Sequence, residues 1–479
     1  MKKIKLSMIL SFFLAFCMIE GVFGQVTLPA IFSNDMVLQR NSNVKIWGKS
    51  APKQRISIHG TWSEHVVETT SDADGRWKTE IPTPEAGGPY KLQIRENTGE
   101  EIVFSGVLIG EVWLCSGQSN MEMPLKGYPA QHIEGGQEQI VSAKNPLLRM
   151  ITVPRKAELE PTDNFEGAWK STSSETVSNF SATAWYFGNL LTEVLDVPVG
   201  LIHVSYGGSN NEAWMDAEML KDFPAIDLPK QKSDIKEPNR TATALYNGML
   251  SPIIGYGIAG VIWYQGESNY DRPDQYERLL PTMVSSWRAQ WSVGEFPFYY
   301  AQIAPFNYAQ FTPNEVIEKN NSAFIRDAQR KAADKIPNSG MVVLLDVGER
   351  DNIHPAKKKE VGHRFAYWAL ANTYGLKGFE FAGPVYKEFA TEGSVVTVSF
   401  DQVPTGITSY GKEVLGFEIA GEDRKFHPAQ AVLGRKSIKL SSPNVPNPLA
   451  VRYAFKDYVA AEIFSTAGLP LSSFRTDDW

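Results

Sequence analysis

The chain has 479 residues, enough for about three domains of ordinary size, and its 43% hydrophobic and 21% charged residues are typical of a folded globular protein. The net charge of −7 argues against a nucleic-acid-binding protein, which needs a basic surface. Cysteines at positions 17 and 115 are too few for a cysteine-rich metal site or a disulfide framework. We therefore expect domains that are stabilised by packing alone.

The first 24 residues predict a secretory signal peptide. Lysines at positions 2, 3 and 5 precede a short apolar run, and Val22 and Gly24 occupy the −3 and −1 positions of a cleavage site before Gln25. A lipoprotein signal at Cys17 is the alternative, and the bulky Phe16 before it disfavours that signal. We expect export to the periplasm or the extracellular space. No other stretch is long and apolar enough to span a membrane.

Residues 25–105 predict an N-terminal β module. Segments 44–48 and 55–60 alternate apolar and polar side chains, as half-buried strands do. Turn signals at 72–76 and 87–89 separate further strand-like segments. We expect a small sandwich-like or jelly-roll module here.

Residues 106–380 predict an α/β core, and residues 381–479 predict a C-terminal β module. In the core, near-continuous apolar segments alternate with helix-like stretches, which favours a parallel sheet covered by helices on both faces. The strand-like segments are 107–115, 148–153, 199–204, 258–264, 298–303 and 341–345, and the helix-like ones are 182–195, 276–291, 322–335 and 357–374. Binding sites in such sheets lie at the carboxyl ends of the strands.

Ser119 is the candidate nucleophile. It follows an apolar strand in a glycine-containing turn, 117–121, where its own backbone N–H can face a developing oxyanion. The turn differs from the Gly-x-Ser-x-Gly elbow of the α/β-hydrolases. An ordinary turn serine that caps a helix is the plainer interpretation, so a base must be found for Ser119 to matter.

His354 is the candidate base, within the segment 351–355. It lies beyond the last apolar segment of the core, and Asp351 stands three residues before it. A carboxylate there can accept a hydrogen bond from one ring nitrogen while the other faces the serine. A solvated loop before a helix is the alternative interpretation.

Two further strand ends carry unusual polar residues. In segment 204–209, Gly208 offers a backbone N–H that a ligand can approach closely. In segment 262–269, Gln265 and Asn269 have amide groups that can donate to an oxyanion, and Glu267 can bind substrate or order the site. Each segment alone reads as a capped loop, whereas all of them at strand ends predict an active site.

The chain resembles the sialate O-acetylesterase family, a branch of the SGNH hydrolases. The resemblance covers nearly the whole mature chain, and its first and third blocks are long and specific. The matching segments are 112–124, 206–208 with 212–214, 263–269, 351–355, 35–40, and 468–470 with 474–477.

The resemblance implies a flavodoxin-like three-layer α/β/α core, flanked by N- and C-terminal β-sandwich-like modules. It also implies that Ser119 attacks an acetyl ester, that His354 acts as base and then acid, and that Asp351 orients His354. By analogy the oxyanion is held by the N–H groups of Ser119 and Gly208 and by the Gln265 side chain. No metal and no cofactor are implied.

One departure from the family pattern is visible. The family commonly has Thr-Pro-Ala after the paired glycines, and this chain has Ser209, Asn210 and Asn211 there. We therefore expect a difference in acyl or sugar preference.

We expect an O-acetylated sugar or glycan as substrate: a sialic acid by the family's usual label, or a plant polysaccharide such as xylan or pectin. Two rival interpretations remain. One is a glycosidase that uses Glu267 with a second carboxylate, and the other is a non-catalytic carbohydrate-binding protein. The sequence leaves the oligomeric state and the roles of the β modules open.

Overall fold

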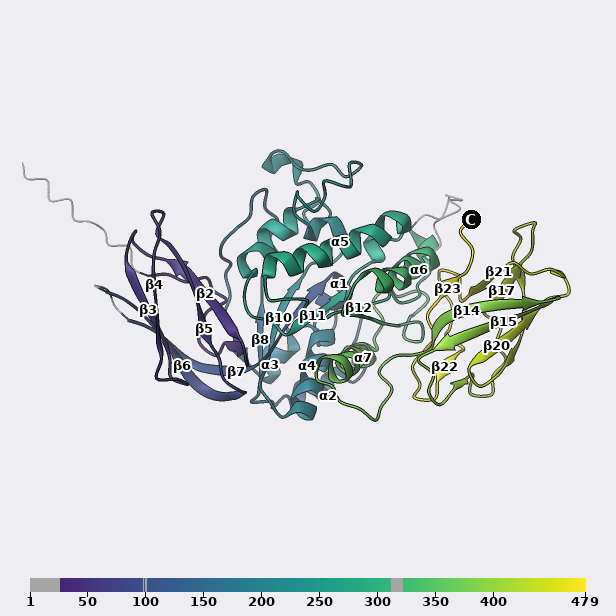
Figure 1. Ribbon diagram of the computed structural model, residues 1–479, viewed down its shortest axis with the longest axis horizontal. Coiled ribbons are helices and arrows are strands. Elements are labelled where there is room, and N and C mark those ends of the chain that lie inside the picture. Colours follow the sequence, from purple (N-terminus) through teal and green to yellow (C-terminus); the bar gives the residue numbers. More distant parts are fainter. Residues whose placement is uncertain (1–25, 98, 100, 312–321) are drawn as a thin grey trace, which may run out of the picture.

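A computed structural model describes residues 26–97, 99, 101–311 and 322–479, so the predicted signal peptide lies outside the described residues. The predicted architecture is confirmed. An N-terminal β module, an α/β core and a C-terminal β module follow one another along the long axis (Figure 1). Within the described part of the chain, no helix is long and apolar enough to cross a membrane.

The core sheet has the strand order β13-β12-β11-β7-β10-β8-β9 and is parallel except for β9, which runs antiparallel to β8. Each strand predicted for the core is present. The bounds are β7 (Glu101–Gly117), β8 (Leu148–Thr152), β9 (Lys170–Ser171), β10 (Val199–Ser205), β11 (Gly260–Tyr264), β12 (Phe298–Ala301) and β13 (Ser339–Val342).

Both faces of this sheet are buried. Successive side chains of a strand point to opposite faces, so each strand contributes to two apolar clusters. In β11, Val261 and Trp263 join the apolar cluster that contains α5, and Ile262 and Tyr264 join the cluster that contains α4 and α7. The α-helices are α1 (Ser119–Glu122), α2 (Gly136–Ser142), α3 (Ser174–Ser178), α4 (Ala182–Leu195), α5 (Pro273–Trp291), α6 (Ala323–Ala332) and α7 (Lys358–Trp368). Figure 1 shows α5 and α6 on one side of the sheet, with α4 and α7 on the other.

Short helical turns of other types occur mostly in loops, and two of them extend predicted helices. The 3₁₀ turn 333–335 continues α6, and the π-helical turn 369–373 continues α7. These turns are η1 (Asn211–Trp214), η2 (Lys232–Asp234), η3 (Tyr246–Leu250), η4 (Ser251–Ile253), η5 (Glu267–Asn269), η6 (Tyr308–Gln310), η7 (Ala333–Lys335) and η8 (Ala369–Thr373).

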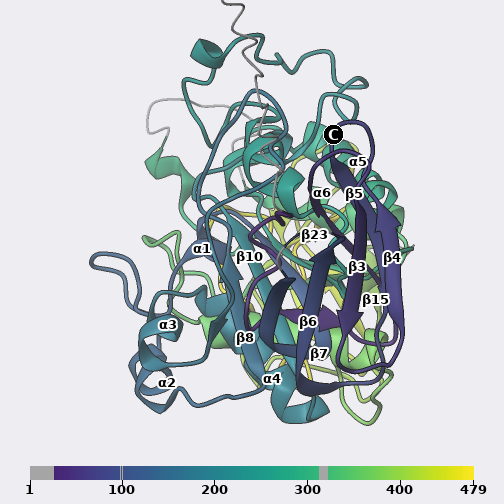
Figure 2. The same cartoon turned by 90° about the vertical axis from the view of Figure 1, so that its left-hand side faces the viewer.

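The N-terminal module shares strand β7 with the core. Its β6 pairs antiparallel with the first half of β7, and β3 lies between β4 and β6 (Figure 2). The predicted boundary at 105/106 lies inside β7, and we retain 25–105, 106–380 and 381–479 as a proposed division. The module's strands are β1 (Val37–Gln39), β2 (Asn43–Lys49), β3 (Arg55–Gly60), β4 (Val66–Thr70), β5 (Arg76–Pro82) and β6 (Gly87–Glu96).

The C-terminal module contains two four-stranded antiparallel sheets, β14-β15-β20-β19 and β18-β17-β21-β23, around one apolar cluster, and a two-stranded antiparallel pair, β16-β22. The buried guanidinium of Arg326 on α6 anchors this module to the core, because it donates to the Ser473 hydroxyl and to the backbone oxygen of Asp457. The strands are β14 (Val385–Glu392), β15 (Val395–Asp401), β16 (Ile407–Thr408), β17 (Phe417–Ala420), β18 (His427–Pro428), β19 (Gln430–Leu433), β20 (Ser437–Ser441), β21 (Ala450–Tyr453), β22 (Phe464–Ser465) and β23 (Phe474–Arg475).

Candidate active site

Ser119 lies where the strand order of the core sheet reverses. It follows β7, whose last residue Gly117 is in register with Ser205 at the end of β10 and with Tyr264 at the end of β11. The glycine loop after β10 and the polar loop after β11 therefore flank Ser119. Such switch points are where open α/β sheets bind their ligands.

The turn into α1 depends on Gly117. Its φ is 141°, and a Cβ atom there would lie 2.1 Å from the backbone oxygen of Tyr264. Only glycine fits so close to the neighbouring strand. The chain can then turn at once into α1, which begins at the half-buried Ser119.

Two backbone N–H groups next to Ser119 are free to bind an oxyanion. Within the described residues, the N–H groups of Ser119 and Gly208 donate to no protein acceptor. The glycine loop touches the nucleophile, because a Cβ atom at Gly207 would lie 3.4 Å from the Cβ of Ser119. Gly208 has a φ of 71°. The geometry therefore suits the predicted role of these N–H groups.

A partly exposed ion pair between Glu122 and Arg155 holds the glycine loop in place. The Gly207 N–H donates to Glu122 Oε2 at 2.8 Å, and Arg155 donates to both oxygens of Glu122 at 2.5 Å. The Arg155 guanidinium also lies over the Tyr206 ring, 4.7 Å from its centroid. Because Glu122 ends α1, this pair ties the nucleophile's helix to the loop opposite.

His354 is held in the form that a general base requires. Its Nδ1 lies 2.8 Å from Gln131 Oε1, and its ring packs edge-on against Tyr128 at a centroid distance of 5.3 Å. Since an amide oxygen only accepts, Nδ1 carries the proton and Nε2 keeps its lone pair. Burial, with the Lys358 charge as a second cause, lowers the pKa of His354 to about 4. The imidazole is therefore neutral at pH 7.

The loops of Ser119 and His354 are joined by direct contacts. Asn120 Nδ2 donates to the backbone oxygen of Ile353 at 3.1 Å, so the neighbours of the two candidates are hydrogen-bonded. The Tyr128 hydroxyl donates to the backbone oxygen of Ser119 at 3.4 Å while its ring contacts His354. No hydrogen bond links the Ser119 hydroxyl to the imidazole in this arrangement, although both residues are described.

Asp351 does not contact His354 in this structure. Its exposed carboxylate accepts a hydrogen bond from Gln310 Nε2 at 3.2 Å. The hydrogen bond at Nδ1 of His354 is made with Gln131 instead. The Asp-x-x-His spacing alone therefore does not bring the carboxylate into hydrogen-bond contact with the ring in this structure.

The amide groups of Gln265 and Asn269 are engaged in the scaffold in this structure, and their role at the oxyanion stays a prediction. Gln265 Nε2 donates to Asn269 Oδ1 at 2.7 Å and to the Ser209 backbone oxygen at 3.1 Å. Asn269 Nδ2 donates to Glu212 Oε2 at 2.9 Å. Both side chains are fully buried, so their N–H groups must find partners inside the protein.

Glu267 is also buried, and it accepts a hydrogen bond from Asn120 Nδ2 at 2.6 Å. Burial raises its pKa above the ordinary value. Its Oε1 is bonded to Asn120, its buried Oε2 has no hydrogen-bond partner among the described residues, and the side chain is closed off from solvent rather than facing a second carboxylate across an open cleft, as a glycosidase would need. The structure therefore favours the ordering role predicted for Glu267 over a role in acid–base chemistry on a glycosidic bond.

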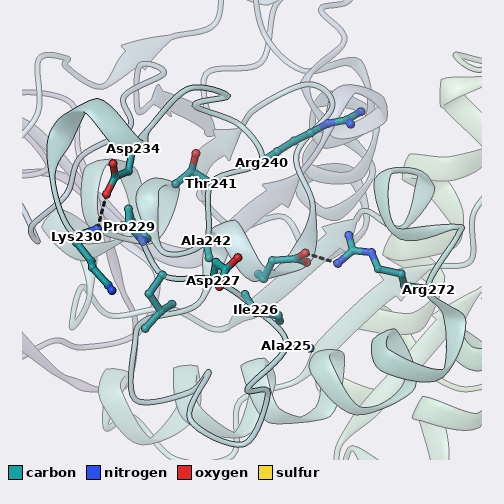
Figure 3. A pocket seen from close by; sticks show the side chains of 12 residues that line it. Ala225, Ile226, Asp227, Pro229, Lys230, Asp234, Arg240, Thr241, Ala242 and Arg272 are labelled. Carbon is teal, nitrogen blue, oxygen red and sulfur yellow. Dashed lines mark hydrogen bonds and ion pairs between the residues drawn. The ribbon is translucent and has the colours of Figure 1, made fainter.

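A pocket of about 560 Å³ lies near the glycine loop after β10. Figure 3 shows the side chains that line this pocket. Asn239 connects the two, because its side chain donates to the Gly207 backbone oxygen at 2.9 Å and the next residue, Arg240, lines the pocket. An ion pair between Arg272 and Glu212 forms part of the wall. The lining residues are Glu212, Ala225, Ile226, Asp227, Leu228, Pro229, Lys230, Asp234, Arg240, Thr241, Ala242 and Arg272.

Sequence reasoning missed several residues that build the site. Glu122 and Asn120 stand inside the nucleophile motif, and their positions beside Ser119 were the available signal. Tyr128 and Gln131 come from an irregular loop, and Lys358 looks like one of three consecutive surface lysines. Only the fold shows that these side chains turn toward the site.

Comparison with known proteins identifies the family. The carbohydrate esterase family described as sialic acid-specific acetylesterases matches residues 109–371. The chain belongs to this family. Human sialate O-acetylesterase is 31% identical over 390 residues, which cover 74% of this chain and 72% of the human protein. The mouse enzyme of the same name is 27% identical over 425 residues, covering 77% of this chain and 78% of its own.

A solved structure extends the likeness to the flanking modules. The crystal structure of a carbohydrate acetylesterase from Xanthomonas citri matches this esterase with a TM-score of 0.86 and 33% sequence identity, covering 95% of this chain and 100% of that one. The predicted family resemblance and the predicted core are thereby confirmed.

We predict that the substitution Gln131→Glu moves the acid limb of the esterase's pH–rate profile to higher pH by about one to two units. A carboxylate at Nδ1 favours the imidazolium form, so the base loses its lone pair earlier as the pH falls. The measurement is kcat/KM against pH. Gln137→Glu, which adds the same charge at an exposed position on α2, is the control. An unmoved limb in the Gln131 variant would contradict the contact with His354.

Proposed function

We propose that this esterase removes acetyl groups from O-acetylated sugars through an acyl-enzyme on Ser119, with His354 as base and then acid. One observation carries the proposal. At the switch point of the sheet, the N–H of Ser119 itself and that of Gly208 in the adjacent loop are free within the described part of the chain, and Ser119 lies beside the loop of an imidazole that is neutral at pH 7. These are the parts that acyl transfer needs.

The proposed steps follow from this geometry. As the Ser119 oxygen attacks the acetyl carbonyl, its proton passes to Nε2 of His354, and the N–H groups of Ser119 and Gly208 bind the new oxyanion. The tetrahedral intermediate then expels the sugar oxygen, which takes the proton from His354. Water repeats the sequence on the acyl-enzyme and releases acetate.

We propose that Asp351 supplies the negative charge for the imidazolium that forms in these steps. Gln131 is neutral, so it can fix the resting tautomer of His354 without stabilising a cation. The Asp351 carboxylate is exposed and stands on the same loop, three residues away. Catalytic hydrogen bonds often tighten only when substrate is bound, and a turn of this side chain from Gln310 to His354 is such a change.

For the substrate, we propose an acetylated sialic acid or an acetylated polysaccharide such as xylan or pectin. The names of the mammalian relatives support the first, and the Xanthomonas enzyme supports a carbohydrate acetyl ester in general. Residues 209–211, where this chain departs from the family pattern, are relevant to the choice of substrate. Asn210 Nδ2 donates to the backbone oxygen of Arg240 at 3.1 Å, so the departure positions a residue that lines the neighbouring pocket.

We propose further that the protein is exported, on the strength of the basic and apolar start of the chain. N-terminal sequencing of protein from the producing cell tests this, with Gln25 as the expected first residue. An intact start at Met1 would refute it.

We predict that the substitution Ser119→Ala abolishes acetate release while folding is retained, because the attacking oxygen is gone. The assay compares acetate release from acetylated sialic acid, xylan and pectin side by side, for wild type and variant. Acetate release by the variant at the wild-type rate would refute the mechanism. New reducing ends would indicate a glycosidase, and sugar binding without turnover in the wild type would indicate a binding protein.

We predict that Asp351→Asn lowers kcat by about 100-fold or more, since an amide cannot offset the imidazolium charge, by analogy with the loss seen when a triad aspartate is replaced. Gln131→Ala should lower kcat far less. The measurement is steady-state kinetics on the best substrate of the acetate screen. The opposite ranking of the two variants would assign the orienting role to Gln131.

A further inference from the structure

Lys358 is a buried lysine that the proposed chemistry does not use. It begins α7, and its exposed fraction is 0%, whereas Lys357 and Lys359 beside it are exposed. A buried ammonium is unfavourable, and the positive end of a helix dipole makes it more so at this position. A lysine that is placed against both of these preferences indicates a functional constraint at its position.

The ammonium of Lys358 is satisfied by two groups of the active-site loops. It donates to Asn120 Oδ1 at 2.8 Å and to the backbone oxygen of Pro355 at 2.7 Å. Asn120, itself buried, donates in turn to Glu267 Oε1 at 2.6 Å and to the backbone oxygen of Ile353 at 3.1 Å. Lys358, Asn120 and Glu267 therefore form one buried chain.

These hydrogen-bonded side chains contact the segments of both candidate catalytic residues. Asn120 directly follows Ser119, and the two backbone oxygens that it and Lys358 bind belong to Ile353 and Pro355, the residues on either side of His354. The relative position of nucleophile and base is thus fixed by side chains that touch neither reacting atom.

We propose that the buried chain of Lys358, Asn120 and Glu267 positions His354 against Ser119, so that these three are positioning residues of the esterase. The inference rests on the proposed roles of Ser119 and His354. It also explains why Glu267 is buried and bound by Asn120 rather than open to substrate.

The charge of Lys358 also affects the pKa of His354, the candidate base. The carboxylates that act on Lys358 are Glu267 and Glu349, and burial outweighs them, lowering the pKa of Lys358 to about 7. The charge of Lys358 helps to lower the pKa of His354, and the charge of Glu122 opposes this. Removing the ammonium should therefore raise the pKa of His354.

Lys358→Met is the main test, because methionine keeps most of the side chain's length and removes its charge. We expect kcat to fall by about 10- to 100-fold, the loss that a misplacement of about 1 Å brings, with KM close to that of the wild type. The acid limb of kcat/KM should move to higher pH. Lys359→Met, the exposed neighbour, is the matched control and should behave as the wild type. Wild-type kcat and an unmoved acid limb in Lys358→Met would overturn the proposal.

A second variant covers the case in which Lys358→Met fails to fold. The double substitution Asn120→Asp with Glu267→Gln exchanges amide and carboxylate, so the mutual contact, the contact with Lys358 and the total charge are retained. The donor to the Ile353 backbone oxygen is lost, and a carboxylate oxygen takes its place. We expect the variant to fold, with a lowered unfolding temperature and a lowered kcat, and wild-type kcat would overturn the proposal. Failure of the proposed function shows differently, as activity that survives Ser119→Ala.

Discussion

The active site depends on one continuous strand. The 17 residues of β7 begin in the N-terminal module, paired with β6, and end in the centre of the core sheet between β10 and β11. Because a strand buried on both sides has no freedom to shift its register, the end of β7 is fixed relative to both neighbours. Ser119 follows closely after β7, so its position is fixed with the end of that strand. The N-terminal module is thereby part of the mechanical support of the nucleophile, whether or not it also contacts sugar.

Several polar residues in the motifs at the strand ends stabilise the scaffold around the candidate site. Gln265, Asn269 and Glu212 form a buried hydrogen-bond chain behind the glycine loop, and Arg272 closes it. Hydrogen bonds between buried polar groups favour one arrangement, because an alternative leaves further groups unpaired. The site can therefore keep its N–H groups free for an oxyanion while the residues around them are immobile.

The sequence allowed the elements and the principal candidates to be predicted, because both follow from patterns along the chain. Apolar segments and helical periodicity gave the core strands and α4, whose predicted span of 182–195 equals the observed one. Ser119 and His354 were predicted to share one site because ligands bind at the carboxyl ends of the strands in such sheets. The direction of individual side chains is a tertiary property, so the sequence could not show that the Gln265 and Asn269 amides bond within the scaffold. For the same reason nothing in the sequence distinguished the buried Lys358 from the exposed lysines beside it.

The position of Asp351 follows from the electrostatics of the base. Burial makes the imidazole of His354 neutral at pH 7, and the same burial makes its protonated form unfavourable. Such a base is always ready to accept a proton but holds it weakly, so the imidazolium needs stabilising charge at the moment of transfer. Gln131 offers a dipole only, and Lys358 adds a like charge nearby. Glu122 is already paired with Arg155. Among the described residues, two carboxylates on the same loop have no cationic partner, Glu349 and Asp351. Glu349 accepts from the Asn352 amide and the Ala356 N–H, whereas the exposed Asp351 accepts from the neutral amide of Gln310. The charge balance of the reaction therefore supports the proposed pairing of Asp351 with His354.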